Sequence, residues 1–186
     1  MAHEMDGVNI AELHQCIERE FSKKFPQFKL IKFYREEEER RAPDPKDLPA
    51  LLLEIPEFEL NLDEDSGTEQ MPLVARIEAR IIDTFNQRDA KIKIRALAVS
   101  LAYFLYKNKR FYQMQNKAAG HVVVETITED NFFQELDRYE VWRVDFSLPI
   151  NIGDNIWSES GVTPTPVYSY DPKIGLGYED SYKDIL

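Results

Sequence analysis

The chain has 186 residues, a formal net charge of −11 and an ordinary hydrophobic fraction of 43%. A chain of this length and composition can bury a sizeable core, which excludes disorder throughout. The excess of acids disfavours binding to free nucleic acid, because such affinity depends on neutralising phosphates. Cys16 is the single cysteine, so no internal disulfide is possible, and we expect it to be a small core residue. We expect neither a signal peptide nor a transmembrane helix.

The first 60 residues predict one helix and two strands. Apolar side chains recur at helical spacing at Ile10, Leu13, Ile17 and Phe21. Asn9 is a suitable N-cap, and Pro26 ends the helix. The runs 28–34 and 49–60 are β-prone, and Pro56 marks an edge or a bulge because it cannot donate to a ladder. The charged segment between them, 35–47, is expected to be a solvated loop.

Residues 72–85 predict a strand with two different faces. One face is apolar and consists of Leu73, Ala75, Ile77, Ala79 and Ile81. The other face carries Arg76, Glu78 and Arg80, whose charges can pair with neighbours on the sheet. A second helix follows Asp89, its expected N-cap, with a buried stripe of Ile94, Leu97, Ala98, Leu101, Phe104 and Leu105.

Residues 121–130 and 136–152 predict the last two strands. Every second residue of the second one is apolar: Trp142, Val144, Phe146, Leu148, Ile150 and Ile152. This face should meet the core, while Arg143 and Asp145 should face outward or meet a partner. Pro149 interrupts the ladder late in the strand, which fits an edge or an extension away from the sheet.

The order helix, three strands, helix, two strands predicts a single α+β domain over residues 1–153. We expect a mostly antiparallel or mixed sheet covered by two main helices. Residues 154–186 form an irregular aromatic C-terminal tail with Trp157, Tyr168, Tyr170, Tyr178 and Tyr182. This tail either wraps its own domain or forms an arm that becomes ordered against a neighbour.

No motif for catalysis, for a cofactor or for a metal is evident. The three histidines are far apart, and no nucleophile elbow or phosphate loop is present. Asp63 and Asp65 are spaced as in a calcium loop, but Gly67 comes one residue early and Val74 stands where a glutamate is needed. We therefore predict a protein that is not an enzyme and holds no cofactor.

The end of the second helix carries a basic cluster of Lys107, Lys109 and Arg110 among aromatic residues. One interpretation is the ordinary basic end of a helix with aromatic anchors. The other is a patch for a single nucleic-acid strand, which gains importance if copies of the chain form a ring around one lumen.

Several segments resemble a known family. The segments "LPALLLEIPEFEL", "LVARIEARII", "IKIRALAVSLAYFL" and "FFQELDRYEVWRVDFSLPINIG", followed by a tryptophan segment, occur in this order over about residues 8 to 160. In order and in the "YEVWRVDF" strand, they are similar to the tail-terminator, or tail-completion, proteins of Mu-like contractile-tailed phages and prophages. The charged segment 35–47 and the tail after residue 160 are longer than in a minimal member of that family.

The resemblance implies a structural role without a cofactor. Such proteins form a ring, usually a hexamer, on the last ring of tail-tube protein. The ring ends tube growth and joins the tail to sheath and head-connector proteins, and DNA only passes through the lumen. The resemblance implies assembly in the host bacterial cytoplasm and then a place in the virion tail.

A ring requires residues that cross to the next subunit. The candidates in the sheet are Arg76, Glu78, Arg80, Arg143, Asp145 and Pro149, and those in the tail are Trp157, Tyr168 and Tyr170. Two other interpretations stay open. One is a different head-tail joining protein, and the other is an unrelated cytoplasmic enzyme or ligand-binding protein.

Overall fold

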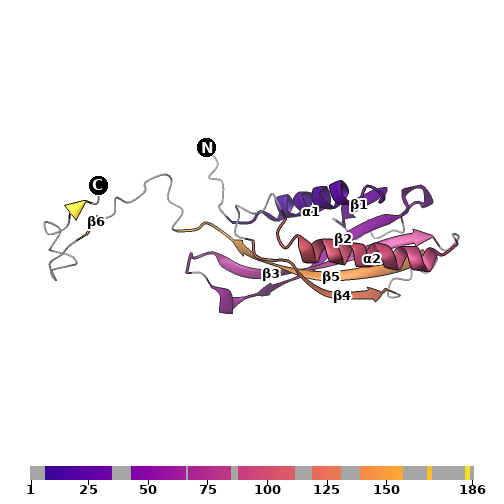
Figure 1. The fold of residues 1–186 in the computed structure, drawn as a ribbon. Helices are drawn as coiled ribbons and strands as arrows, with labels where there is room; N and C mark the ends of the chain where they lie inside the picture. The colour runs from indigo at the N-terminus through magenta and orange to yellow at the C-terminus, as the bar shows by residue number, and fades with distance from the viewer. Residues whose placement is uncertain are drawn as a thin grey trace. The chain divides into compact units, whose positions relative to one another are not determined.

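The computed structural model of the protein describes residues 7–34, 43–65, 67–84, 88–111, 119–130 and 139–156, together with short strands at 167–168 and 183–184. The first 156 residues contain two helices and a five-stranded sheet in the predicted order (Figure 1). The helices are α1, Ile10–Lys24, and α2, Ala90–Lys107. The strands are β1, Leu30–Phe33, β2, Ala50–Leu60, β3, Met71–Thr84, β4, Val123–Glu129, and β5, Tyr139–Ile152. Two short 3-10 helices, η2, Pro45–Asp47, and η3, Leu62–Glu64, lie in the connections.

The sheet is mixed and has the strand order β1-β2-β3-β5-β4. β1 runs parallel to β2, and all the other pairs are antiparallel. The β3–β5 ladder is the longest and runs from Met71 opposite Ile152 to Thr84 opposite Tyr139. The α+β fold with a mixed sheet is therefore confirmed.

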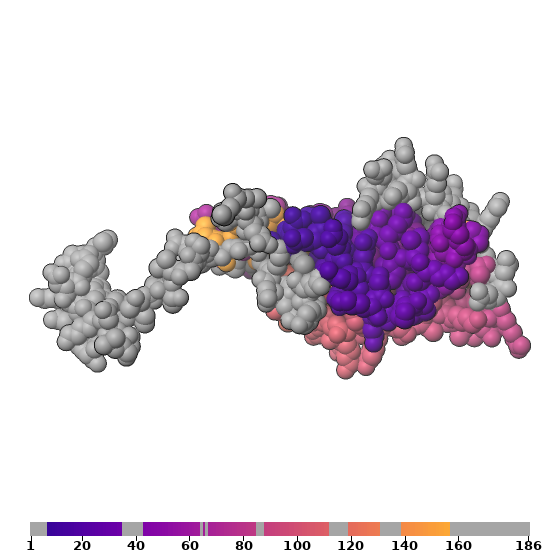
Figure 2. All heavy atoms as spheres, turned by 90° about the horizontal axis from the view of Figure 1, so that it is seen from above, coloured from indigo at the N-terminus to yellow at the C-terminus, as the bar shows by residue number. Residues whose placement is uncertain are grey.

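Both helices cover one face of the sheet and share one apolar core with it (Figure 1). Phe21 of α1 lies at the centre of that core. Its ring centroid is 6.0 Å from that of Phe104 on α2, 6.4 Å from Phe146 on β5 and 5.9 Å from Phe111. Figure 2 shows the molecule from above, with the indigo and violet surface of the first part of the chain, which includes α1, facing the viewer.

The alternating face of β5 meets this core as predicted. Its fully buried residues are Val144, Phe146, Leu148 and Ile150, while Trp142 is partly buried at the margin. Apolar side chains on every second residue place one face of the strand against the helices, because successive side chains point to opposite faces.

The two helices begin differently. Asn9 caps α1 as predicted, because its Oδ1 accepts hydrogen bonds from the backbone N–H groups of Ala11 at 2.9 Å and Glu12 at 3.3 Å. Asp89 precedes α2, also as predicted, but its backbone is left-handed, with φ of 62°, and its side chain makes no capping bond. An N-cap side chain folds back onto the helix from an extended backbone, which Asp89 does not have.

The two strand prolines lie where strand pairing is irregular or ends. Pro56 was predicted to mark an edge or a bulge, and the β2–β3 register does shift between Glu54 and Glu57. Pro149 lies just past the β4–β5 ladder, which ends at Ser147, and the strand continues there paired with β3. On the other side of the strand the described pairing is an isolated bridge between Ala119 and Ile150, so the expected edge at Pro149 stays a prediction. The carbonyl of Pro149 accepts a bond from Gly120 N at 2.7 Å, so its nitrogen faces the same side, away from β3. The β3–β5 ladder therefore passes Pro149 without losing a donor. Gly120 needs to be a glycine here, because a Cβ atom at this position would lie only 2.8 Å from Pro149 Cβ.

Contacts along the chain separate two compact units, Met1–Ile156 and Trp157–Leu186. The last residues of the first unit are held by two bonds near the β2–β3 turn. Ile156 N donates to Thr68 O at 3.2 Å, and Gln70 Nε2 donates to Gly153 O at 2.9 Å. In the second unit, β6, Val167–Tyr168, pairs antiparallel with β7, Lys183–Asp184.

Candidate functional site: the open face and free edges of the sheet

The face of the sheet away from the helices carries charges in rows. Glu78 of β3 lies opposite Glu54 of β2 and Asp145 of β5. In the next row on the same face, Arg80 lies opposite Arg143. Like charges directly opposite each other repel. Each arginine is therefore stabilised by the carboxylates of the neighbouring row.

Arg80 is buried and binds three carboxylates of its own chain. Its Nη1 lies 3.0 Å from Glu54 Oε2, its Nε lies 3.0 Å from Asp130 Oδ2, and its Nη2 contacts Glu78 Oε2. Only 4% of the Arg80 side chain and 3% of that of Asp130 are exposed. A buried guanidinium needs such partners, because an unpaired charge in a protein interior is costly.

Arg143 completes the network at the boundary with solvent. Its Nε lies 2.8 Å from Asp145 Oδ1, and its Nη1 lies 3.7 Å from Glu78 and 3.8 Å from Asp130. The Nε and Oδ1 atoms have no hydrogen-bond partner although they lie close together. The N–H is therefore not directed at the oxygen, and the contact is an ion pair rather than a hydrogen bond.

The network holds more carboxylates than guanidinium groups. Glu54, Glu78, Asp130 and Asp145 surround two arginines. Burial raises the pKa of Asp145 above its ordinary value, and the charge of Arg143 offsets this only in part. Burial lowers the pKa of Arg143, but the charges of its three carboxylates outweigh that effect and leave it raised. The fold thus disfavours the charged form of Asp145 relative to its form in water.

Arg76 forms a second, exposed cluster nearer the β2–β3 turn. Its guanidinium lies 2.6 Å from Glu59, 3.1 Å from Glu125 and 3.7 Å from Glu57. The bond to Glu59, followed by the charge of Glu125, raises the pKa of Arg76. Ser147 of β5 lies opposite Arg76, and its small side chain leaves room for the guanidinium to reach across β5 to β4.

Five of the residues predicted for an assembly interface thus lie in these two clusters: Arg76, Glu78, Arg80, Arg143 and Asp145. Their carboxylate and guanidinium groups meet within one chain. Arg80 is buried, whereas Arg76 is accessible. That these residues meet a neighbouring subunit stays a prediction.

Two backbone edges lie open among the residues that the structure describes. β4 pairs with β5 on one side, and no described strand lies on its other side, Val123–Glu129. β1 pairs only with the first half of β2, so residues 55–60 continue past the end of β1. The strand order places these edges at opposite margins of the sheet. At β1, by contrast, α1 covers part of the margin, because Glu18 Oε1 accepts a bond from Phe33 N at 2.7 Å.

The predicted basic cluster lies at the end of α2. Lys107, Lys109 and Arg110 are all exposed. The Lys107 ammonium lies 5.7 Å from the ring centroid of Tyr103, and that of Lys109 lies 5.9 Å from the ring of Tyr106. Both are cation–π contacts, which hold the lysines beside exposed rings.

The remaining predicted residues are only partly described. Pro149 pairs with Val74 of β3 and is partly buried. Tyr168 belongs to β6, where only its backbone pairing is described. Trp157 and Tyr170 lie outside the described residues.

Sequence reasoning missed the partners that complete the clusters. Asp130, Glu54, Glu59 and Glu125 come from β2 and from the β4 region, and no local spacing connects them with β3. A signal for the exposed apolar side of α2 was present, because Ile92, Val99, Tyr103 and Tyr106 recur at helical spacing outside the predicted buried stripe.

No group of histidine, cysteine and carboxylate side chains suited to a metal ion occurs among the described residues. Neither described helix is long and apolar enough to cross a membrane. No protein-family model matches the chain, and no curated protein sequence matches it either.

Proposed function

We propose that this protein is a structural assembly protein of a phage or prophage tail, acting as the tail terminator. Copies form a ring on the last ring of tail-tube protein, end its growth and offer a surface to head-connector proteins. The resemblance of the ordered segments to tail terminators supports this role, and the α+β fold is compatible with it.

The observation that carries the proposal is the pair of open edges at opposite margins of one sheet. Val123–Glu129 lies at one margin and residues 55–60 lie at the other. Two different surfaces on opposite sides of a protomer support head-to-tail contacts, which close into a ring when the rotation between subunits permits. Addition of a strand to an open edge is a common means of joining such subunits.

Both edges also carry irregularities that limit indiscriminate pairing. The β2–β3 register shifts around Pro56, and the β4–β5 register shifts between Val124 and Thr126. Bulges and prolines at edges protect natural sheets against aggregation. We therefore expect free subunits to contact one another only transiently and to form a stable ring where the tail tube aligns them, so that a monomer in solution is compatible with the proposal.

Electron microscopy of induced lysates tests the proposal. A phage or prophage lacking this protein should produce over-long or headless tails, and expression of the intact chain in trans should restore tails of uniform length. Normal infectious particles without the protein would contradict termination. Tails of uniform length that fail to join heads would instead assign the protein to the head side of the junction.

A further inference from the structure

The β2–β3 turn carries an exposed apolar surface with acidic surroundings, here called the hairpin patch. Its residues are Phe58, Leu60, Leu62 and Met71, which are between 40% and 71% exposed. Residues 55–71 contain six acids and no base, although two of the acids, Glu57 and Glu59, bind Arg76 on the other face of the sheet. Figure 1 shows this turn projecting beyond the ends of both helices, so no helix covers its apolar side chains.

The outer side of α2 carries the opposite combination, here called the α2 patch. Ile92, Val99, Tyr103 and Tyr106 are between 56% and 66% exposed and recur at i, i+7, i+11 and i+14. This spacing places them in one stripe along the helix. Residues 90–110 contain six bases and no acid.

The other helix of the same fold lacks such a stripe. Its apolar residues Leu13, Cys16, Ile17 and Phe21 are buried, and its exposed positions include Glu12, Gln15, Arg19 and Lys23. The apolar outer side of α2 is therefore a property of that helix and not of the fold. Exposed apolar surface that is continuous and flanked by one sign of charge is typical of a binding surface.

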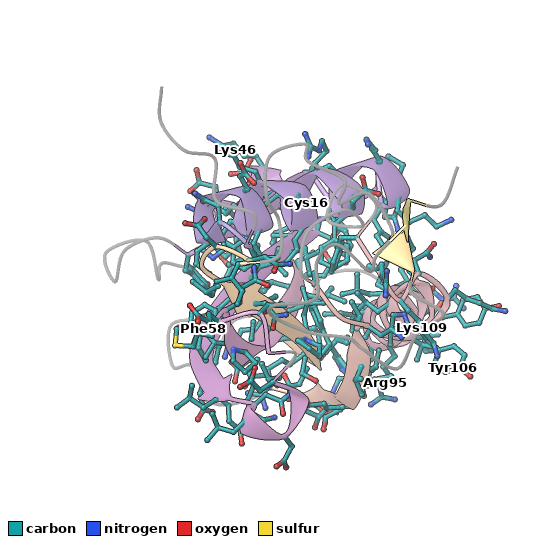
Figure 3. All side chains as sticks on the ribbon, turned by 90° about the vertical axis from the view of Figure 1, so that its left-hand side faces the viewer. Cys16, Lys46, Phe58, Arg95, Tyr106 and Lys109 are labelled. Atoms are coloured by element: carbon teal, nitrogen blue, oxygen red, sulfur yellow. The ribbon has the colours of Figure 1, made fainter. Side chains whose placement is uncertain are left out.

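We propose that the hairpin patch of one copy of this chain docks on the α2 patch of a second copy. The proposal rests on the proposed function and names the contact that joins neighbouring subunits. Acids of one patch face bases of the other, and both patches contribute exposed apolar side chains. Three of these charges also have a partner in their own chain, since Glu57 and Glu59 bind Arg76 and Lys91 lies 3.7 Å from Glu140. Figure 3 shows Phe58 on one side of the molecule and Arg95, Tyr106 and Lys109 on the opposite side, which is the arrangement that head-to-tail contact requires.

Charge also argues against the symmetric alternatives. Two α2 patches would bring bases against bases, and two hairpin patches would bring acids against acids. Such contacts are repulsive, whereas the mixed contact is attractive. The positions of the two patches agree with the two open edges. The helix of the α2 patch contacts β4, and the hairpin patch includes residues from the end of β2.

Cysteine cross-linking of the full-length chain tests this contact. Leu62→Cys and Val99→Cys replace exposed residues in the two patches, and the native Cys16 is buried. The two variants, one carrying a longer affinity tag, are mixed in equal amounts and oxidised. The mixed disulfide dimer should form about tenfold faster than either like-with-like dimer, because docking raises the effective concentration of the two thiols.

Gln15→Cys on the polar outer side of α1 is the matched control for Val99→Cys and should show no preference. Reversing charge with Lys107→Glu and Lys109→Glu should abolish the preference, as should Asp63→Lys with Glu69→Lys. Both reversals together should restore it. Equal rates for all dimers, or a preference that survives a single reversal, would overturn the proposal.

Two further outcomes are decisive. Tight binding of a single-stranded oligonucleotide that Lys107→Glu abolishes would make α2 a nucleic-acid surface and overturn the contact between copies.

The lysate experiment separates this inference from the proposed function. A preferred mixed dimer with normal tails in the deletion leaves the contact and refutes termination, whereas over-long tails without a preferred mixed dimer leave termination and refute the contact.

Discussion

Replacement of Arg80 by methionine should strongly destabilise the protein. The guanidinium is 4% exposed and binds Glu54, Glu78 and Asp130, of which Asp130 is 3% exposed. Methionine fills part of the space but removes the nearest cation from the buried Asp130, whose other arginine, Arg143, lies 3.8 Å away. Breaking a buried pair in this way costs about 3–5 kcal/mol. For a unit of this size, that lowers the melting temperature by roughly 6 to 20 °C.

Arg76→Met is the matched control, because Arg76 also binds three carboxylates but is exposed to solvent. Exposed pairs contribute little to stability, so this variant should melt close to the wild type. Thermal and urea unfolding followed by circular dichroism measures both. If Arg80→Met is insoluble, Arg80→Lys keeps the charge without the planar fork and should show an intermediate loss. Equal melting temperatures for Arg80→Met and Arg76→Met would refute the reasoning.

Three more predictions concern the charge of Asp145, the cap of α1 and the second unit. Because burial raises the pKa of Asp145 in the folded state, its contribution to the free energy of unfolding falls as the pH rises from about 4 through that pKa. Asp145→Asn should flatten this dependence in urea titrations and cause no loss at neutral pH; a clear loss there would contradict the assignment. Asn9→Ala should cost about 1 kcal/mol in the same assay, because two backbone donors of α1 lose their acceptor; an unchanged midpoint would exclude that role. Removal of residues 157–186 should leave a cooperative melt, since contacts separate the units after Ile156, but should impair assembly on tails; loss of the melt would assign those residues to the core.

Local pattern was sufficient to predict most elements of the fold. The helix after Asn9 and the alternation in β5 depend on neighbours in sequence, which a single chain displays. The parallel orientation of β1 beside β2 was not predictable in the same way. The residues of a strand predict which of its faces is buried. They do not predict which strand lies beside it, or whether that neighbour runs parallel or antiparallel to it.

The charged face shows the same limit. Arg76 and Arg80 occupy equivalent positions in one alternating pattern, yet one is exposed and the other buried. The difference comes from long-range neighbours. Arg80 lies opposite Leu52, and next to it on the same face Ile82 belongs to a small apolar cluster. Arg76 lies opposite Glu57 near the projecting turn. The pattern predicts the face of a residue, whereas tertiary contacts determine its exposure.

The arrangement of charge decides which parts of the sheet remain suited to recognition. A partner on the open face would have to desolvate arginines and carboxylates that already bind one another, with little gain. Both open edges carry an excess of acids, since β4 carries Glu125 and Glu129, residues 55–60 carry Glu57 and Glu59, and the single charge of Arg76 is shared among three of these four carboxylates. Edge pairing alone would therefore bring like charges together. The bases of the α2 patch lie beside β4 and supply the opposite charge on one margin only. The contact between copies is therefore expected to be head-to-tail, with the acidic margin of one copy on the basic margin of the next.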